Sequence, residues 1–174
     1  MSEIHDAVRA WAKGIHPSEA AVELLIHHGK AIYDGAPWLS ELYPSGAEMP
    51  RMVAVDVDAL VYEAGAWSGS ERRVVAIAAS LLSTEHPVTL EDAVTGLDRQ
   101  NLTLVLAAIA HANGSHQHSD MIYSEDGRPV GFERLSSLYP WPGEEPPRGP
   151  GANPQPPNVS FGGPPPATDV GPGL

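Results

Sequence analysis

Residues 67–114, WSGSERRVVAIAASLLSTEHPVTLEDAVTGLDRQNLTLVLAAIAHANG, decide the fold because they hold two strongly apolar segments of the chain. These segments, residues 74–82 and 102–112, read as buried helices, and residues that favour helix starts and stops join them. We expect the two helices to form the centre of the core, with the preceding residues packed around them. The predicted fold class is therefore all-α, as a small single-domain helical bundle.

Short polar sequences mark where these helices begin and end. Ser68-Gly69-Ser70-Glu71 matches a capping box, in which a serine hydroxyl and a glutamate carboxylate accept hydrogen bonds from exposed backbone N–H groups. Asp98 is suited to cap the last long helix, Asn113-Gly114 is suited to end it, and Thr89 can cap a shorter helix between the two. We expect the apolar face of the last helix to consist of Leu102, Val105, Leu106, Ile109 and Ala112.

The residues before the central stretch contain weaker signals. Apolar residues at helical spacing predict a helix over residues 3–13 and another that begins at Pro17. Residues 34–50 are interrupted by glycine and proline, and between these breaks we expect a short helical turn at Trp38–Tyr43. Residues 52–55 contain β-branched side chains, which favour a short strand, although no partner strand is evident in the sequence.

The chain after Gly114 divides into two parts. Residues 115–139 form an extension of the helical domain (residues 2–114), and Asp126-Gly127 predicts the tight turn of a short hairpin over residues 121–132. Residues 140–174 are rich in proline and glycine and cannot bury enough apolar surface to offset the entropy of ordering. We expect this last segment to be a disordered tail.

The bulk composition excludes several classes of function. The chain has 174 residues, a net charge of −12 and no cysteine, which fits one acidic domain without disulfides or thiolate metal sites. Acidity disfavours binding to nucleic acid or to an anionic membrane surface. No apolar run approaches the roughly 20 residues of a membrane span, and the first residues do not resemble a secretory signal. We therefore expect a cytoplasmic protein that binds neither nucleic acid nor membranes.

Histidines gather with an acid at the end of the last long helix. His111, His116 and His118 lie close in sequence to Asp120, and imidazole with carboxylate is a ligand set that suits zinc or nickel. These four residues are a candidate metal site, and a solvated histidine-rich loop is the alternative interpretation. The pair His27-His28 points in directions about 100° apart on a helix and is poorly placed to share one ion.

The central stretch contains four short segments that together match the order of segments in a known protein family. They are Trp67–Arg73, Ala76–Leu81, Leu90-Glu91-Asp92 and Thr95–Asp98. Together they resemble the signature segment, the acidic pair and the D-loop of ABC-type ATPases, which implies nucleotide binding. The chain lacks the G-x-x-x-x-G-K-[ST] loop that holds phosphates, so this hypothesis is a degenerate fragment completed by another chain. It requires a strand ending at the acidic pair, whereas a helix starting at Thr89 would contradict it.

Four motifs also recur in order along the same stretch. They are an S-G-x-E-R-R start, an I-A-A-S-L core, a T-G-L-D-R-x-N turn and a final apolar helix, found here at Ser68–Arg73, Ile77–Leu81, Thr95–Asn101 and Leu102–Ala112. This combination is similar to that of small uncharacterised helical proteins of actinobacteria. The resemblance implies an all-helical core and no particular activity.

No catalytic or cofactor motif stands out, so we expect a non-catalytic protein without a bound cofactor. The favoured hypothesis is a helical interaction or adaptor protein whose partner is another protein. Aromatic residues would supply its contacts, and the candidates are Trp38, Tyr43 and Trp67 in the helical domain and Tyr139 and Trp141 before the tail. Docking of the last two on the chain's own domain is the alternative. A metal-dependent accessory protein or enzyme that uses the histidines is the second functional hypothesis.

Overall fold

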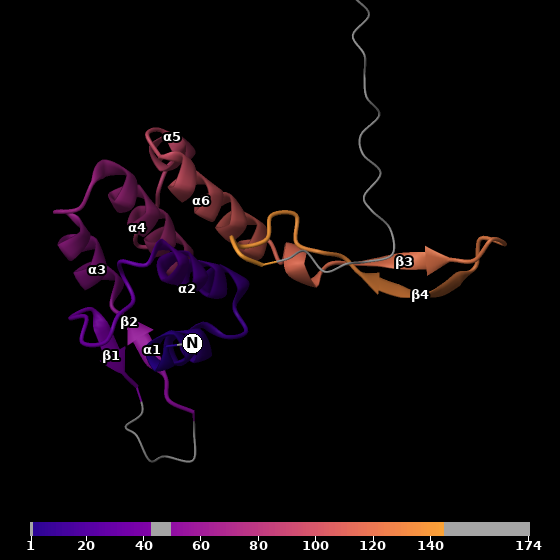
Figure 1. Cartoon of the computed structure of the whole chain (residues 1–174), viewed down its shortest axis with the longest axis horizontal. Coiled ribbons are helices and arrows are strands. Elements are labelled where there is room, and N and C mark those ends of the chain that lie inside the picture. Colours follow the sequence, from indigo (N-terminus) through magenta and orange to yellow (C-terminus); the bar gives the residue numbers. More distant parts are fainter. Residues whose placement is uncertain (1, 43–49, 145–174) are drawn as a thin grey trace, which may run out of the picture.

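The computed structural model describes residues 2–42 and 50–144, and this part of the chain is mostly helical (Figure 1). Two small antiparallel sheets, β1–β2 and β3–β4, accompany the helices, so the predicted all-α class is corrected to a mostly helical fold. The elements follow in the order α1 (Glu3–Ala12), α2 (His16–His28), β1 (Leu39–Glu41), β2 (Val53–Val55), α3 (Val57–Ala64), α4 (Gly69–Leu82), α5 (Leu90–Val94), α6 (Arg99–Ala112), the 3-10 helix η1 (Ser115–Gln117), β3 (Ser119–Tyr123) and β4 (Pro129–Arg134).

Helix α2 is the central element of the core. It contacts α1, α4 and α6, and its side chains Ala20, Ala21, Val22, Leu24 and Leu25 are completely buried. Helices α4 and α6 were expected at the centre, but both pack on α2 more extensively than on each other. A helix buried on three sides needs small residues where neighbours approach closely, and the two alanines of α2 allow that approach.

The starts of α4 and α6 meet in one hydrogen-bonded network. Ser68 and Glu71 form the predicted capping box at α4, and the Asp98 side chain caps α6 by accepting from the Asn101 N–H at 2.8 Å. Ser70 Oγ donates to Asp98 Oδ2 at 2.7 Å, and the buried Asn101 side-chain amide donates to Ser70 Oγ at 2.9 Å. The network therefore fixes the relative position of two helices whose first residues are far apart in sequence.

The buried face of α6 differs from the predicted one. Leu102 and Ile109 are exposed although both were expected to face the core. Helix α6 carries apolar residues on almost every side, so helical spacing alone does not select a face, and contact with α2 selects it instead. The residues of α6 that are buried are Asn101, Leu104, Val105, Ala107, Ala108 and Ala110.

The segment after α2 forms a strand and not the predicted helical turn. Leu39 pairs with Val55 and Glu41 with Val53, so β1 and β2 are antiparallel partners. Trp38, just before β1, is buried with 4 % of its surface exposed, and its indole N–H donates to the Ala31 carbonyl at 2.8 Å. A three-residue strand depends on its partner for its hydrogen bonds, and that partner lies outside the local sequence.

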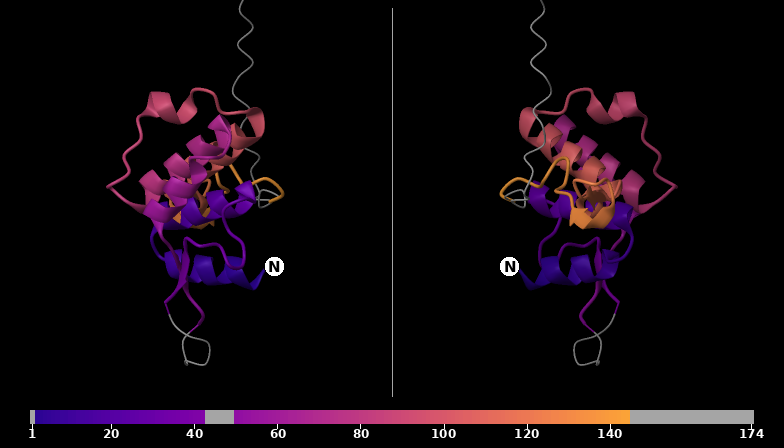
Figure 2. Two further views of the ribbon diagram at one scale, coloured as in Figure 1. Left: turned by 90° about the vertical axis from the view of Figure 1, so that its left-hand side faces the viewer. Right: turned by 90° about the vertical axis from the view of Figure 1, so that its right-hand side faces the viewer.

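Strands β3 and β4 form a hairpin that projects from the helical part of the molecule (Figure 1). We call residues 119–134 the hairpin arm; the sequence predicted this hairpin over 121–132, with its turn at Asp126-Gly127. The right-hand view of Figure 2 shows the arm nearly end-on, so it extends away from the helices and does not lie across them. The Leu135 N–H donates to the His118 carbonyl at 2.9 Å and closes the root of the arm.

The chain returns to the helical part after the arm. Trp141 is buried with 5 % of its surface exposed, although the sequence analysis placed it in the tail that begins at residue 140. Its ring stacks on His27 with a centroid distance of 4.9 Å and an interplanar angle of 3°. The rest of that predicted tail, residues 145–174, lies outside the described residues.

Candidate functional site

The start of α2 and the end of α6 bring together a group that we call the histidine cluster: His16, Glu19, His111 and His116. His16 and Glu19 lie in the first turn of α2, His111 lies in the last turn of α6, and His116 lies in η1. Gly114, with φ of 78°, reverses the chain between α6 and η1. A side chain at Gly114 would meet the His16 ring, since a Cβ there would lie 3.2 Å from His16 Cδ2.

The Glu19 carboxylate is the centre of the cluster. Its Oε1 accepts from the Gly14 N–H at 2.8 Å, and its Oε2 lies 3.3 Å from His16 Nδ1 and 3.7 Å from His111 Nε2. The His116 ring lies 4.2 Å from the His111 ring and 5.3 Å from the His16 ring, measured between centroids. Three imidazoles thus surround one carboxylate at the junction of α2, α6 and η1.

Trp141 determines the tautomer of His111. The indole N–H can only donate, and it points at His111 Nδ1 from 3.2 Å. His111 Nδ1 is therefore the unprotonated nitrogen, and in the neutral ring the proton is on Nε2, which faces Glu19. Two buried nitrogens of the cluster, His111 Nε2 and His116 Nδ1, have no hydrogen-bond partner among the described residues.

The electrostatics of the cluster favour a charged Glu19 and a neutral His116 at neutral pH. Burial raises the pKa of Glu19, but hydrogen bonds from the Gly14 N–H and from His16 outweigh it and bring the pKa below its ordinary value. Burial, followed by repulsion from His111 and His16, lowers the pKa of His116. The cluster therefore places a charged carboxylate close to a neutral imidazole.

Two adjoining pockets open beside the cluster. The first has a volume of about 420 Å³ and is lined by Lys13, Glu19 and His116 among others. The second, of about 500 Å³, reaches His27 and Trp141. A pair of short hydrogen bonds joins α1 to α2 in the wall that both pockets share, from Arg9 Nε and Nη2 to the Glu23 carboxylate at 2.6 and 2.9 Å. Small polar species can therefore reach the cluster from solvent.

The predicted metal site is divided by the structure. His111 and His116 belong to the cluster, whereas His118 and Asp120 are exposed at the start of the arm. Asp120 Oδ1 accepts from the neighbouring Met121 N–H at 2.8 Å. The chain turns away into β3 after η1, and this turn separates His118 and Asp120 from the other two histidines.

His16 and Glu19 are the cluster residues that the sequence analysis missed. Their spacing of three residues places both on one face of the first turn of α2, which is the signal that could have found them. Their partner His116 is about a hundred residues away, so no local pattern indicates the contact. His27 and His28 do point apart as predicted, His27 toward Trp141 and His28 toward Trp67.

The hairpin arm carries a second candidate site. Met121 and Phe132 are direct cross-strand partners, and strand alternation places Tyr123 on the side of Met121. All three side chains are exposed. We call these three residues the arm face.

Of the five predicted contact aromatics, the structure leaves Tyr139 exposed. Trp38 and Trp141 are buried in the chain's own fold, so the expectation that they form an exposed contact surface is wrong. Trp67 is half-buried, with Lys30 Nζ 4.6 Å above its ring centre. Tyr43 lies outside the described residues.

The segments that resemble an ATPase serve as helix caps. Ser68 and Glu71 cap α4, and the Glu71 carboxylate also accepts from Lys30 Nζ at 2.9 Å, which with the capping bonds lowers its pKa to about 2. Thr89 caps the helix α5, where a nucleotide site would require a strand ending at Glu91. This finding contradicts the nucleotide-binding hypothesis.

Comparisons with protein-family models, with curated proteins and with solved structures found no match for this chain. Across residues 2–42 and 50–144, every helix is too short or too polar to cross a membrane. The function must therefore be argued from the histidine cluster and the hairpin arm themselves.

Proposed function

We propose that this protein is a non-catalytic interaction protein that binds a partner protein through the arm face. One observation carries the proposal: three large apolar side chains share one face of a two-stranded hairpin and remain exposed. Phe132 is 73 % exposed and Tyr123 is 60 % exposed. Contiguous exposed apolar residues on a folded protein mark interaction surfaces more often than scattered ones do.

The energetics of the arm also favour a partner. A two-stranded hairpin without a packed face is only marginally stable in water, and none of the helices in the described part of the chain is layered on the projecting arm (Figure 1). Burying the three side chains of the arm face would contribute roughly 4.5–9 kcal/mol before the costs of association. That gross contribution is comparable with the cost of association itself, so the arm face can act as an anchor.

The opposite side of the arm indicates what the partner carries. Asp120 and Glu133 are direct cross-strand partners, and like charges in this position destabilise a hairpin. Neither carboxylate has an ion pair within the described residues. A groove with basic residues at its rim would relieve this repulsion, whereas a second copy would add an acidic pair and a further net charge of −12. The proposed partner is therefore a different protein, with an apolar groove and a basic rim.

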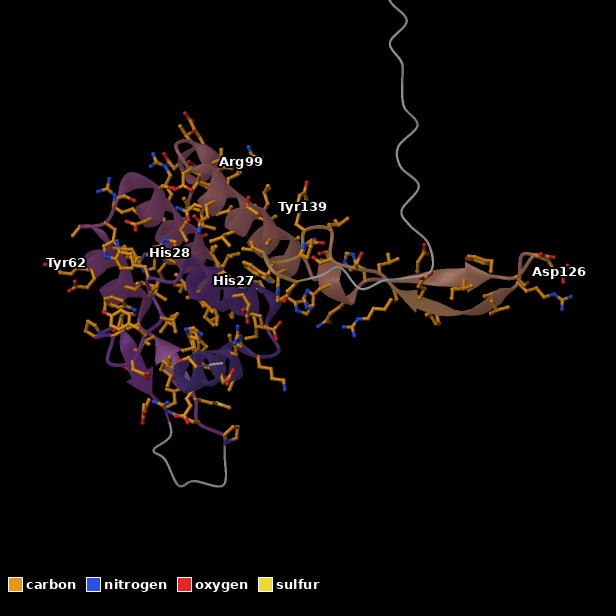
Figure 3. The ribbon with its side chains drawn as sticks, in the orientation of Figure 1. His27, His28, Tyr62, Arg99, Asp126 and Tyr139 are labelled. Atoms are coloured by element: carbon orange, nitrogen blue, oxygen red, sulfur yellow. The ribbon has the colours of Figure 1, made fainter. Side chains whose placement is uncertain are left out.

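Site-specific photocrosslinking tests this proposal. A benzophenone amino acid replaces Phe132 in one variant and Tyr62 in a matched control, and both are made in the cells that naturally produce the protein. Tyr62 is an exposed aromatic, 83 % exposed, on α3 at the other end of the molecule from the arm (Figure 3). We expect a discrete adduct with another protein from position 132 and none of the same mass from position 62.

Binding of the purified adduct partner decides the result. Phe132→Ser should weaken this binding by roughly tenfold or more, since burial of such a side chain is worth about 1.5–3 kcal/mol. Tyr62→Ser should leave binding unchanged, and circular dichroism checks that both variants are folded. The proposal is wrong if position 132 crosslinks to nothing or only to a second copy, or if Phe132→Ser binds the purified partner as well as the unaltered protein does.

A further inference from the structure

The structure assigns a divalent transition-metal site, best suited to zinc, to His16, Glu19 and His116. Their ligand atoms all lie within 4.8 Å of one another. Ligands about 2.1 Å from a tetrahedral ion lie roughly 3.4 Å apart, so small rotations of three side chains bring these atoms to bonding distance. This inference does not depend on the proposed interaction function.

The chemistry of the ligands selects the class of ion. Two imidazoles and one carboxylate form a nitrogen-rich set that zinc accepts readily. Calcium and magnesium prefer sites made of oxygen atoms, and this cluster offers a single carboxylate. Three protein ligands leave a fourth position for water or for a small molecule from the adjoining pockets.

The buried nitrogen of His116 provides independent support. His116 Nδ1 is buried without a hydrogen-bond partner among the described residues, which is uncommon for a buried polar atom. A metal ion bound at Nδ1 would supply the missing interaction, with the proton of the neutral ring on Nε2.

His111 acts beside the ion as a positioning residue and is not one of its ligands. Its Nδ1 accepts from the Trp141 indole at 3.2 Å, so its Nε2 carries the proton and has no lone pair to offer. That Nε2 lies 3.7 Å from Glu19 Oε2. It therefore helps to orient the carboxylate, as groups around metal ligands commonly do.

The site would join two parts of the molecule. His16 and Glu19 belong to α2 at the centre of the core, and His116 belongs to η1 at the root of the hairpin arm. An ion bound to all three would fix that root to the core, so binding should raise the melting temperature of the protein.

Calorimetric titration with zinc chloride tests the inference. The full chain is prepared without a polyhistidine tag and is treated with a chelator that is then removed by dialysis. We expect saturable binding of about one zinc ion per chain and a higher melting temperature with the ion. Cobalt replaces zinc in a parallel sample, where strong visible absorption reports a four-coordinate site.

Variants separate this site from a non-specific one. Glu19→Gln, which keeps the size of the side chain, and His116→Ala should each weaken zinc binding by roughly tenfold or more. His118→Ala is the matched control, because His118 is an exposed histidine next to the same 3-10 helix, and it should bind zinc unchanged. If His116→Ala does not fold, Glu19→Gln alone decides the test.

Three results would overturn the inference. They are the absence of saturable binding, binding that Glu19→Gln leaves intact, and binding that His118→Ala removes. The last result would favour the set read from the sequence, namely His111, His116, His118 and Asp120.

Discussion

Replacing Trp141 by alanine tests whether the chain after the arm is anchored on the helical core. A buried tryptophan removes about 150–250 Å² from water, which corresponds to roughly 4–6 kcal/mol at 25 cal/mol per Å². Measured Trp→Ala changes in cores are about 3–5 kcal/mol. Because Trp141 lies near the end of the described chain, its segment can detach without unfolding the helices, so we expect a loss near the lower limit, about 3 kcal/mol.

Two further variants separate the contributions of Trp141. Trp141→Phe keeps a ring that can stack on His27 but removes the indole N–H that donates to His111. Loss of this hydrogen bond should lower the free energy of unfolding by only about 1 kcal/mol beyond the effect of the smaller ring. Tyr139→Ala is the control, since Tyr139 is exposed (Figure 3), and it should change stability by less than roughly 0.5 kcal/mol.

Urea denaturation followed by far-ultraviolet circular dichroism measures these changes as free energies of unfolding. The reasoning fails if Trp141→Ala lies within roughly 0.5 kcal/mol of the unaltered protein. It also fails if Tyr139→Ala costs as much as Trp141→Ala. The first result would mean that Trp141 is available for contact with another molecule, as the sequence analysis first expected, and the second would mean that Tyr139 also anchors this segment.

Two other predictions concern titration and the network between α4 and α6. Burial is the largest cause that lowers the pKa of His28 and of His116 from an ordinary 6.5. As the pH falls, the unfolded chain therefore takes up protons on these histidines before the folded chain does. The free energy of unfolding should be at its full value above pH 6.5 and should decrease below it. Urea midpoints at several pH values check this, and His28→Gln should reduce the slope. Asn101→Asp should destabilise the fold more than Asn101→Ala, because it places a second carboxylate beside Asp98, whose Oδ2 lies 2.8 Å from the present amide. The difference should disappear when acid protonates the pair, and Gln100→Ala, an exposed change on the same helix, should have little effect.

Local signals in the sequence predicted the elements they control. The Ser68 capping box, the Asp98 cap and the Asp126-Gly127 turn depend on residues a few positions apart, and the structure has all three. Helix starts and tight turns satisfy their hydrogen bonds within one short segment. That is why the starts of α4 and α6 and the position of the hairpin turn could be predicted without knowledge of the fold.

Features that depend on distant partners were not predictable in the same way. Leu39–Glu41 is a strand because Val53–Val55 lies beside it, and the face of α6 that is buried depends on α2. The histidine cluster has the same origin, since His16 and Glu19 meet His116 only after α2 and α6 have packed together. Sequence spacing suggested His118 and Asp120 instead, because closeness along the chain was the only available measure of closeness in space.

The two candidate sites meet at η1 but can be tested separately. His116 in η1 belongs to the histidine cluster, and the His118 carbonyl next to it accepts the hydrogen bond that closes the root of the arm. Glu19→Gln changes a residue of α2 and leaves the arm face intact, whereas Phe132→Ser changes the arm face and leaves all three proposed ligands in place. If each variant affects only its own assay, the sites act independently. If Glu19→Gln also weakens partner binding when zinc is present, the ion holds the arm in its binding orientation.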